Sequence, residues 1–302
     1  MEKGRIVKGT GGLYSVEVLS CGSLPVFSII ECRAKGSFRK DKIVPVPGDF
    51  VLFEPIKEGG GFIIEIEKRK NFLVRPQSAN IDSLIIVAAA ANPDTDLYLL
   101  DKMLCVAVYN NIEVLLAVSK SDIENPGKLC DIYRNSGFKT TFISSKIPEE
   151  YSENLDYIKN FIKGKTCFFT GTSGVGKSSL INCLFPDLNL QTNTLSKKIN
   201  RGRHTTRCTE LYKISDDTYI ADTPGFSMLE IAKFNLIPKE HLLSSFPDIE
   251  KYSHSCKYSD CTHICEDGCS VLSAVDSGKI EKTRHESFKN LYFELKNKNT
   301  WD

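Results

Sequence analysis

The chain has little net charge, no long hydrophobic run and no signal-like start. Its 302 residues carry a formal net charge of +1, so contact with a polyanion must come from local clusters and not from a global field. The longest apolar run, Leu84–Ala91, is too short to span a bilayer, and the N-terminus has no apolar signal core. These absences predict a cytoplasmic protein with no membrane partner.

Cysteine is abundant by contrast, with 11 residues, an odd number. Seven cysteines stand singly in apolar segments, as expected for reduced and buried thiols. The other four lie between Cys256 and Cys269 in a polar stretch, which calls for a separate explanation.

Hydrophobic patterning divides the chain into three parts. Residues 1–70 hold short alternating runs separated by Gly and Pro, which predicts a small antiparallel barrel. From Ser83 apolar strands alternate with helical periods, which predicts a parallel α/β sheet within residues 71–230. Residues 231–302 lose this alternation, and a polar helical tract runs from Val271 to the end. No internal repeat or low-complexity segment is present.

The segment GTSGVGKS matches the phosphate-loop pattern GxxxxGK[ST] in full, after an apolar strand and before a helical pattern. Backbone amides and the positive helix N-terminus would bind phosphates, Lys177 would reach the β- and γ-phosphates, and Ser178 would ligate Mg²⁺. We expect nucleotide contacts here from Gly171, Thr172, Ser173, Gly174, Val175, Gly176, Lys177, Ser178 and Ser179.

Two later segments predict the metal side of this site. The sequence DTPG places Asp222 at the end of an apolar strand, where such an Asp holds the Mg²⁺ shell, and the amide of Gly225 would contact the γ-phosphate. Residues 197–207 carry five basic residues and no acidic one. Within them, Thr206 is the favoured second hydroxyl ligand of Mg²⁺ in a nucleotide-dependent switch. A solvated basic loop remains the alternative for this tract.

Two weaker motifs predict recognition of guanine. The sequence SKSD ends an apolar strand, and the carboxylate of Asp122 matches the N1–H and N2–H₂ donors of guanine, a pair that adenine lacks. Lys120 would lie along the base, and Ser119 stands where the NKxD element of GTPases has Asn. Ser144 and Ser145 end the next strand and resemble the SAK element that contacts guanine O6.

The base-recognition motifs precede the phosphate loop, whereas GTPases usually have them after it. This order predicts a circularly permuted GTPase domain, because a permutation keeps the site when the old termini lie close together. An ATPase with a degenerate base pocket remains the alternative.

Five segments, in this order, resemble the RsgA family of small-subunit-dependent GTPases: SKSD, GTSGVGKSSL, GRHTTR, DTPGF and CKYSDCTHICEDGC. Shorter matches are PVPGDFV and RPQSANIDSLIIVAA. The resemblance implies a multi-domain α/β protein with an N-terminal OB-fold on 16S rRNA, a permuted GTPase centre and a C-terminal zinc-binding helical domain. It also implies a role in late maturation of the 30S subunit, with hydrolysis of GTP to GDP stimulated by that subunit. We expect a monomer.

The cysteine cluster suits a tetrahedral Zn²⁺ site, because thiolates and imidazole are its preferred ligands. The resemblance assigns the family spacing C-x4-C-x-H-x5-C to four residues and leaves Cys265 surplus. A site filled by four protein ligands is structural. Coincidental buried thiols remain the alternative. The expected ligands are Cys256, Cys261, His263 and Cys269.

Hydrolysis requires a group that orients the attacking water. Many GTPases have Gln after the DxxG glycine, but this chain has Phe226, whose ring cannot do so. His204 is the expected catalytic residue, since neutral imidazole can accept a proton or orient water, and it matches the family's switch histidine. Contact with RNA or solvent alone is the alternative for His204. An rRNA-binding platform with incidental turnover is the alternative for the whole protein.

Overall fold

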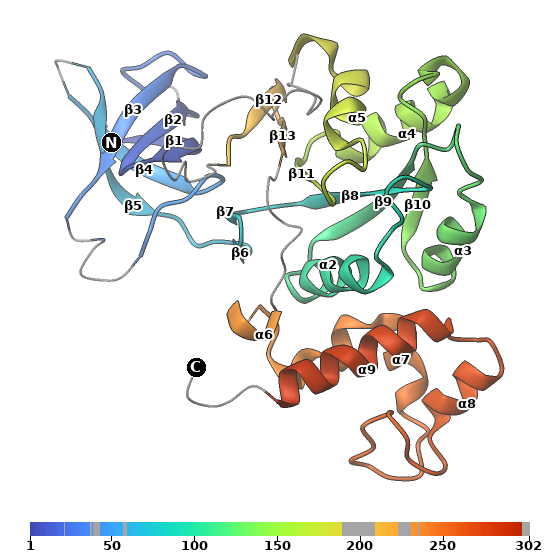
Figure 1. The fold of residues 1–302 in the computed structure, drawn as a ribbon. Helices are drawn as coiled ribbons and strands as arrows, with labels where there is room; N and C mark the ends of the chain where they lie inside the picture. Colours follow the sequence, from blue (N-terminus) through green and yellow to red (C-terminus); the bar gives the residue numbers. More distant parts are fainter. Residues whose placement is uncertain are drawn as a thin grey trace, which may run out of the picture. The chain divides into compact units, whose positions relative to one another are not determined.

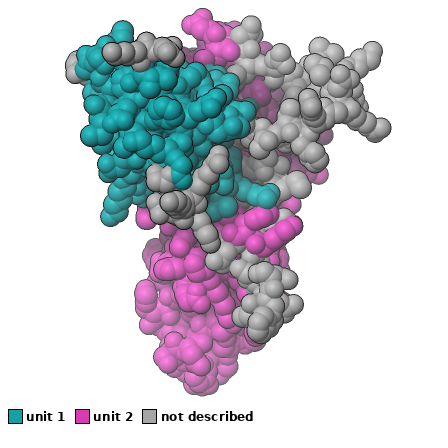
Figure 2. Space-filling view, turned by 90° about the vertical axis from the view of Figure 1, so that its left-hand side faces the viewer, with its two compact units in different colours: residues 1–83, 162–169, 197–225 teal, residues 84–161, 170–196, 226–302 magenta. Residues whose placement is uncertain are grey.

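The computed structural model describes residues 1–20, 22–36, 38, 43–56, 59–188, 209–222, 231–234 and 236–297. The chain divides into two compact units, coloured separately in Figure 2. Unit 1 comprises residues 1–83, 162–169 and 197–225, and unit 2 comprises residues 84–161, 170–196 and 226–302. The predicted residues His204, Thr206 and Gly225, and the basic tract that contains the first two, lie outside the described residues.

Unit 1 contains a closed barrel in the strand order β1-β2-β3-β5-β4 (Figure 1). Alternate side chains along each strand face its core, where Val16, Phe53 and Ile63 are fully buried. The strands are β1 (Glu2–Thr10), β2 (Leu13–Val18), β3 (Ile29–Ala34), β4 (Phe50–Pro55) and β5 (Gly61–Ile66).

The barrel differs from the predicted antiparallel one in a single pair. β3 and β5 run parallel, with Arg33 opposite Phe62, and the other neighbouring pairs are antiparallel. A closed ring with an odd number of strands cannot reverse direction at every pair. Closure of five strands therefore requires at least one parallel pair.

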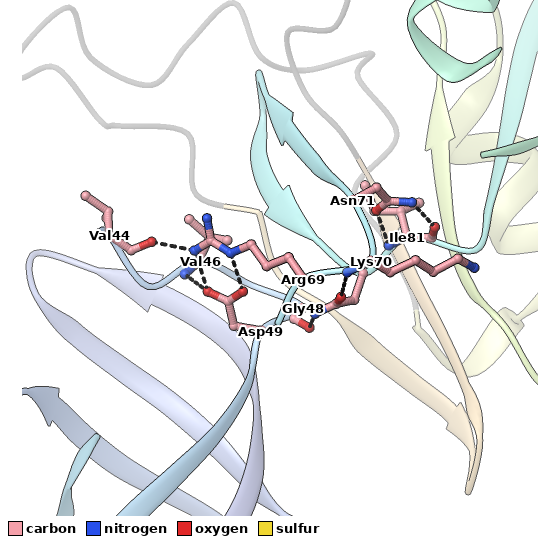
Figure 3. A network of polar contacts seen from close by, with 9 residues as sticks. Val44, Val46, Gly48, Asp49, Arg69, Lys70, Asn71 and Ile81 are labelled. Atoms are coloured by element: carbon pink, nitrogen blue, oxygen red, sulfur yellow. Dashed lines mark hydrogen bonds and ion pairs between the residues drawn. The ribbon is translucent and has the colours of Figure 1, made fainter. Parts of the chain in front are cut away.

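The segment PVPGDFV at the start of β4 contains a buried carboxylate, that of Asp49 (Figure 3). Asp49 is fully buried and accepts hydrogen bonds from the Val46 amide at 2.8 Å and from two nitrogens of Arg69 at 2.7 and 2.8 Å. Gly48 has φ +95°, and a Cβ there would lie 2.0 Å from the carbonyl oxygen of Ala79. Glycine is therefore required where the barrel packs on the hairpin of β6 (Phe72–Val74) and β7 (Gln77–Ala79).

The remaining strands form a six-stranded sheet in the order β10-β9-β8-β11-β13-β12. β10 runs parallel to β9 and β11 runs parallel to β13, as the alternation of strands and helices predicts, while β12 is antiparallel to β13. Every residue of β8 is buried, as expected of a strand covered on both faces. The strands are β8 (Ser83–Ala89), β9 (Glu113–Ser119), β10 (Lys139–Phe142), β11 (Thr166–Thr170), β12 (Tyr212–Ser215) and β13 (Thr218–Asp222).

Helices lie between these strands, as the alternation of apolar strands and helical periods predicts. Asp96 caps the first of them by accepting a 3.0 Å hydrogen bond from the Leu99 amide, and Leu100 and Leu104 of this helix are buried. They are α2 (Leu97–Tyr109), α3 (Gly127–Asn135), η1 (Pro148–Tyr151), α4 (Ser152–Ile162), α5 (Lys177–Leu184) and η2 (Pro186–Leu188).

The C-terminal part of unit 2 is helical. The helical tract predicted from Val271 onwards consists of two helices, because Gly278 adopts a left-handed φ of +72° between them. Phe288 and Leu291 are buried on the second of these helices. The elements are α6 (Ile231–Phe234), η3 (Lys239–His241), η4 (Leu243–Ser245), α7 (Pro247–Ser253), α8 (Ser270–Asp276) and α9 (Lys282–Lys296). Within the described ranges, no helix is both long and apolar enough to cross a bilayer.

A buried ion cluster joins α9 to α2 and α7. Arg284 is fully buried and donates from Nη1 to Asp101 at 2.6 Å and from Nε and Nη2 to Asp248 at 3.0 and 2.9 Å. Burial disfavours the guanidinium charge, but attraction to the two carboxylates outweighs it and raises the pKa of Arg284. Sequence patterning gave no sign of this cluster.

Candidate nucleotide site and metal centre

The phosphate loop connects β11 to α5 and packs closely on β8. A Cβ at Gly171 would lie 2.4 Å from the carbonyl oxygen of Val87, so the backbone approaches the strand without room for a side chain. Gly176 is the N-cap of α5, with a left-handed φ of 92° and no side-chain cap. The first amides of α5 are therefore available to an anion such as phosphate.

The SKSD segment lies beside this loop. Ser119 ends β9, and its hydroxyl donates to the carbonyl of Val175 and lies 3.1 Å from that of Ala88. Lys120 has a φ of +58° and donates from Nζ to the carbonyl of Asn92. Two segments that are more than 50 residues apart in the sequence thus meet within unit 2.

The guanine-recognition carboxylate is oriented by the second predicted base motif. Asp122 accepts a 2.6 Å hydrogen bond from the buried Ser144 hydroxyl and lies 3.5 Å from Lys146 Nζ. The Ser144 bond lowers the pKa of Asp122, which favours the ionised form that accepts the two guanine donors. Ser145 contributes its carbonyl, which lies 3.9 Å from Cys183 Sγ on α5.

Asp222 is the last residue of β13 and pairs in register with Phe169 of the parallel strand β11. The phosphate loop begins two residues after Phe169. Because parallel strands present their carboxyl ends at the same edge, Asp222 lies at the edge of the sheet where β11 also ends.

Three cysteines and one histidine of the C-terminal region come together in a closed cluster. Cys256 Sγ lies 3.8 Å from Cys269 Sγ, and His263 Nδ1 lies 3.5 and 3.6 Å from these two sulfurs. With Cys261, the four ligand atoms are all within 4.8 Å of one another. Zinc bonds of about 2.3 Å to sulfur and 2.0–2.1 Å to nitrogen give tetrahedral donor separations of roughly 3.5–3.8 Å, so the residues fit the ion. The exposed Cys265 is not part of this cluster.

The cluster is supported by two residues that sequence reasoning missed. Glu266 accepts hydrogen bonds from the amides of Thr262, Ile264 and Cys265 at 2.8, 3.0 and 3.1 Å, and also from the Thr262 hydroxyl. Burial opposes its charge, but these donors prevail and lower its pKa to about 2. The buried His285 donates from Nε2 to the carbonyl of His263 at 2.7 Å. Both contacts depend on how the loop folds back, which no sequence spacing encodes.

The surroundings of Cys256 favour its thiolate form. Burial opposes its ionisation, but hydrogen bonds from the backbone amides of Ser270 and Val271, together with those from the Cys269 and Cys261 side chains, outweigh burial and lower the pKa of Cys256. A thiolate is the form that binds zinc. The amides at the start of α8 therefore favour the ligand form of this side chain.

Comparisons with known proteins agree with this architecture. The family model described as RsgA GTPase matches residues 66–232, and that described as RsgA N-terminal domain matches residues 3–63. The curated protein "Small ribosomal subunit biogenesis GTPase RsgA" of Caldanaerobacter subterraneus subsp. tengcongensis is 42% identical, with 98% of this chain and 96% of that protein covered. The protein of the same name from Bacillus subtilis is 36% identical, with 99% of each covered.

Two solved structures share the whole fold. YjeQ from Thermotoga maritima has a TM-score of 0.77 and 30% identity, with 99% of each chain covered. YloQ, described as a circularly permuted GTPase, has a TM-score of 0.76 and 33% identity, with 99% of this chain and 96% of that one covered. The predicted barrel, permuted GTPase fold and family are thereby confirmed: the chain belongs to the RsgA GTPase family.

Proposed function

We propose that this chain hydrolyses GTP to GDP as a factor of small ribosomal subunit biogenesis. In this proposal it binds 16S rRNA in the GTP-loaded state, acts late in 30S maturation, and is stimulated by the 30S subunit. The curated relatives carry small-subunit biogenesis in their names. The observation that carries the proposal is the bond from Ser119 to Val175, because it puts the guanine motif beside the phosphate loop.

One nucleotide would occupy both motifs. Asp122, oriented by Ser144, accepts the guanine donors, while the amides at the start of α5 and Lys177 bind the phosphates. Mg²⁺ would be ligated by Ser178 and Thr206. When bound, the ion would neutralise charge on the β- and γ-phosphates.

Stimulation would act through the switch residues. Asp222 would support the metal shell, and the amide of Gly225 would contact the γ-phosphate. His204 would orient the attacking water, a role that Phe226 cannot fill. A partner that contributes to this site and excludes water can supply a 10³–10⁵-fold acceleration, or roughly 4–7 kcal/mol of barrier reduction.

Zn²⁺ would be bound by Cys256, Cys261, His263 and Cys269 as a structural ion, since four protein ligands leave no open position.

The chain would divide into three domains, residues 1–70, 71–230 and 231–302. It would be a monomer in the cytoplasm. Phosphate contacts to rRNA would come from three basic segments, Arg33–Lys42, Lys197–Arg207 and α9.

The test is the rate of GTP hydrolysis with and without purified 30S subunits, using 50S subunits as the control particle. We expect strong stimulation by 30S and none by 50S. Equal rates under all conditions would favour the alternative, an rRNA-binding platform in which nucleotide is a structural ligand. A degenerate ATPase would instead show ATP turnover equal to that of GTP.

A further inference from the structure

The antiparallel hairpin of β12 and β13 carries Asp222 as its last residue (Figure 1). β13 lies between β11 and β12, whereas β12 is the last strand at its edge in the described part of the six-stranded sheet. Folded proteins commonly cover such an edge with another part of the chain. In unit 1 the barrel makes contacts of this kind with the hairpin.

The first of these contacts is made by the main chain at a bulge in β1. The register of β1 with β2 shifts between Ile6 and Lys8, so Val7 is the extra residue of the bulge. The Val7 carbonyl accepts a 2.8 Å hydrogen bond from the amide of Leu211, which directly precedes β12. Beside it, Lys8 and Glu210 form a β-bridge and an ion pair of 2.9 Å. The entry to the hairpin is therefore joined to the backbone of the barrel.

The second contact is made by a buried carboxylate of the barrel. Glu17 of β2 is only 3% exposed. One of its oxygens accepts a hydrogen bond from the hydroxyl of Tyr219 in β13, and the other lies 3.2 Å from Lys213 Nζ in β12. A single barrel side chain thus binds both strands of the hairpin.

Arg5 of β1 encloses the same tyrosine from another side. Its Cζ lies 4.4 Å from the centre of the Tyr219 ring, and its Nη2 donates a 2.6 Å hydrogen bond to the hydroxyl of Thr166 at the start of β11. Burial raises the pKa of Tyr219, and the hydrogen bond to Glu17 and the charge of Glu17 raise it further. The phenol therefore keeps its proton and remains the donor to Glu17.

We infer that Glu17 is a positioning residue for the metal side of the nucleotide site, because it fixes the β12–β13 hairpin on the barrel and thereby holds Asp222 in place. The inference rests on the proposed function, in which Asp222 supports the Mg²⁺ shell. Tyr219 and Asp222 are three residues apart on one strand, so roughly 10 Å of extended backbone joins them. A displacement of about 1 Å carried along this strand is enough to weaken an interaction that depends on position.

This role predicts a change in the magnesium requirement. Glu17→Met keeps the length of the side chain and removes both of its polar contacts. The variant should need about tenfold more Mg²⁺ for half-maximal binding of GTPγS, the lower end of the loss expected for a supporting group of a metal site. Its affinity for GDP in the presence of EDTA should equal that of the wild type, because Asp122 and the phosphate loop belong to unit 2.

The experiment titrates Mg²⁺ at fixed GTPγS with the full chain and follows binding, not turnover. The matched control is Glu2→Met, which also removes a buried carboxylate of the barrel, one whose hydrogen bonds go to Ser20 and Ser23. This control should lower the melting temperature and keep the wild-type Mg²⁺ requirement. Tyr219→Phe removes one hydroxyl and leaves the ion pair of Glu17 in place, and it should raise the requirement in the same direction as Glu17→Met.

A double variant tests whether Glu17 acts through Asp222. Asp222→Asn alone should raise the Mg²⁺ requirement, and adding Glu17→Met should raise it no further, since effects that pass through one group are not additive. If Glu17→Met shows no cooperative melting transition, Tyr219→Phe takes its place in both experiments.

A wild-type Mg²⁺ requirement in Glu17→Met and Tyr219→Phe would overturn the inference. An equal rise in Glu2→Met would overturn it too, because the effect would then follow from lost barrel stability. An additive rise in the double variant would show that Glu17 does not act through Asp222. A wild-type requirement in Asp222→Asn would instead refute the metal role of Asp222 in the proposed function.

Discussion

The hydroxyl of Ser144 donates a 2.6 Å hydrogen bond to the carboxylate of Asp122, joining the ends of two neighbouring parallel strands. The two motifs that the sequence offered as weak signs of guanine recognition are thus in direct contact. The bond has a chemical consequence, since it lowers the pKa of the carboxyl group that would bind the base.

We predict that Ser144→Ala narrows the pH range of GDP binding. The wild-type carboxyl has a lowered pKa, so its ionised form persists at lower pH and is lost only as the pH falls through that value. Without the donor, GDP affinity measured from pH 7 downwards should begin to fall at a higher pH. The control is Ser136→Ala, which removes a buried hydroxyl that bonds to Ile132 at 2.9 Å. Superimposable pH profiles for Ser144→Ala and the wild type would contradict the prediction.

Arg284→Met should strongly destabilise unit 2. It leaves Asp101 and Asp248 buried without their cation, and removing one partner of a buried ion pair costs about 3–5 kcal/mol. Arg134→Met removes an exposed ion pair with Asp131 and should cost under about 1 kcal/mol. Urea unfolding curves of both variants measure the difference. A similar loss of unfolding free energy in both variants would show that burial of the ion cluster does not determine its contribution to stability.

Glu266→Gln should weaken retention of the proposed zinc ion by the Cys/His cluster. The carboxylate bonds to three loop amides, and loss of such a supporting group typically lowers metal affinity by about 10–100-fold. Zinc release to a chromogenic chelator, followed over time, is the measurement. Asp267→Asn, at the neighbouring position with its side chain 92% exposed, is the control and should release zinc at the wild-type rate. Identical release from both variants would argue against a supporting role for Glu266.

His204→Ala should leave GDP binding intact and lower 30S-stimulated hydrolysis by about 10²–10⁴-fold, the usual range for loss of a general base. The exposed His254 provides the control, because His254→Ala also removes an imidazole. Stimulated turnover at the wild-type rate in His204→Ala would remove this residue from the mechanism.

The sequence predicted the parts of this protein that are local or periodic. The phosphate loop and the base-recognition motifs at Ser119 and Ser144 follow from residue types at fixed spacing, and the resemblance to the RsgA family selected the four clustered ligands. The parallel pairing of β3 with β5 is a consequence of ring closure, and alternation along each strand does not reveal it.

Contacts between distant segments could not be predicted in the same way. Arg284 looks like any cation in a polar helix, and only the packing of α9 on α2 makes it buried. Likewise, Glu266 is an ordinary acidic residue until its loop folds around it. In both cases tertiary structure determines the role, and the sequence records only the residue type.

The most direct test of the account is the nucleotide preference of Asp122→Asn. Xanthine carries a carbonyl where guanine carries its 2-amino group, so an amide at this position should match xanthine better than a carboxylate does. We predict that the variant loses affinity for GDP and gains affinity for XDP, while the wild type shows the reverse order. A variant that still prefers GDP over XDP would contradict the claim that Asp122 and the phosphate loop bind one guanine nucleotide.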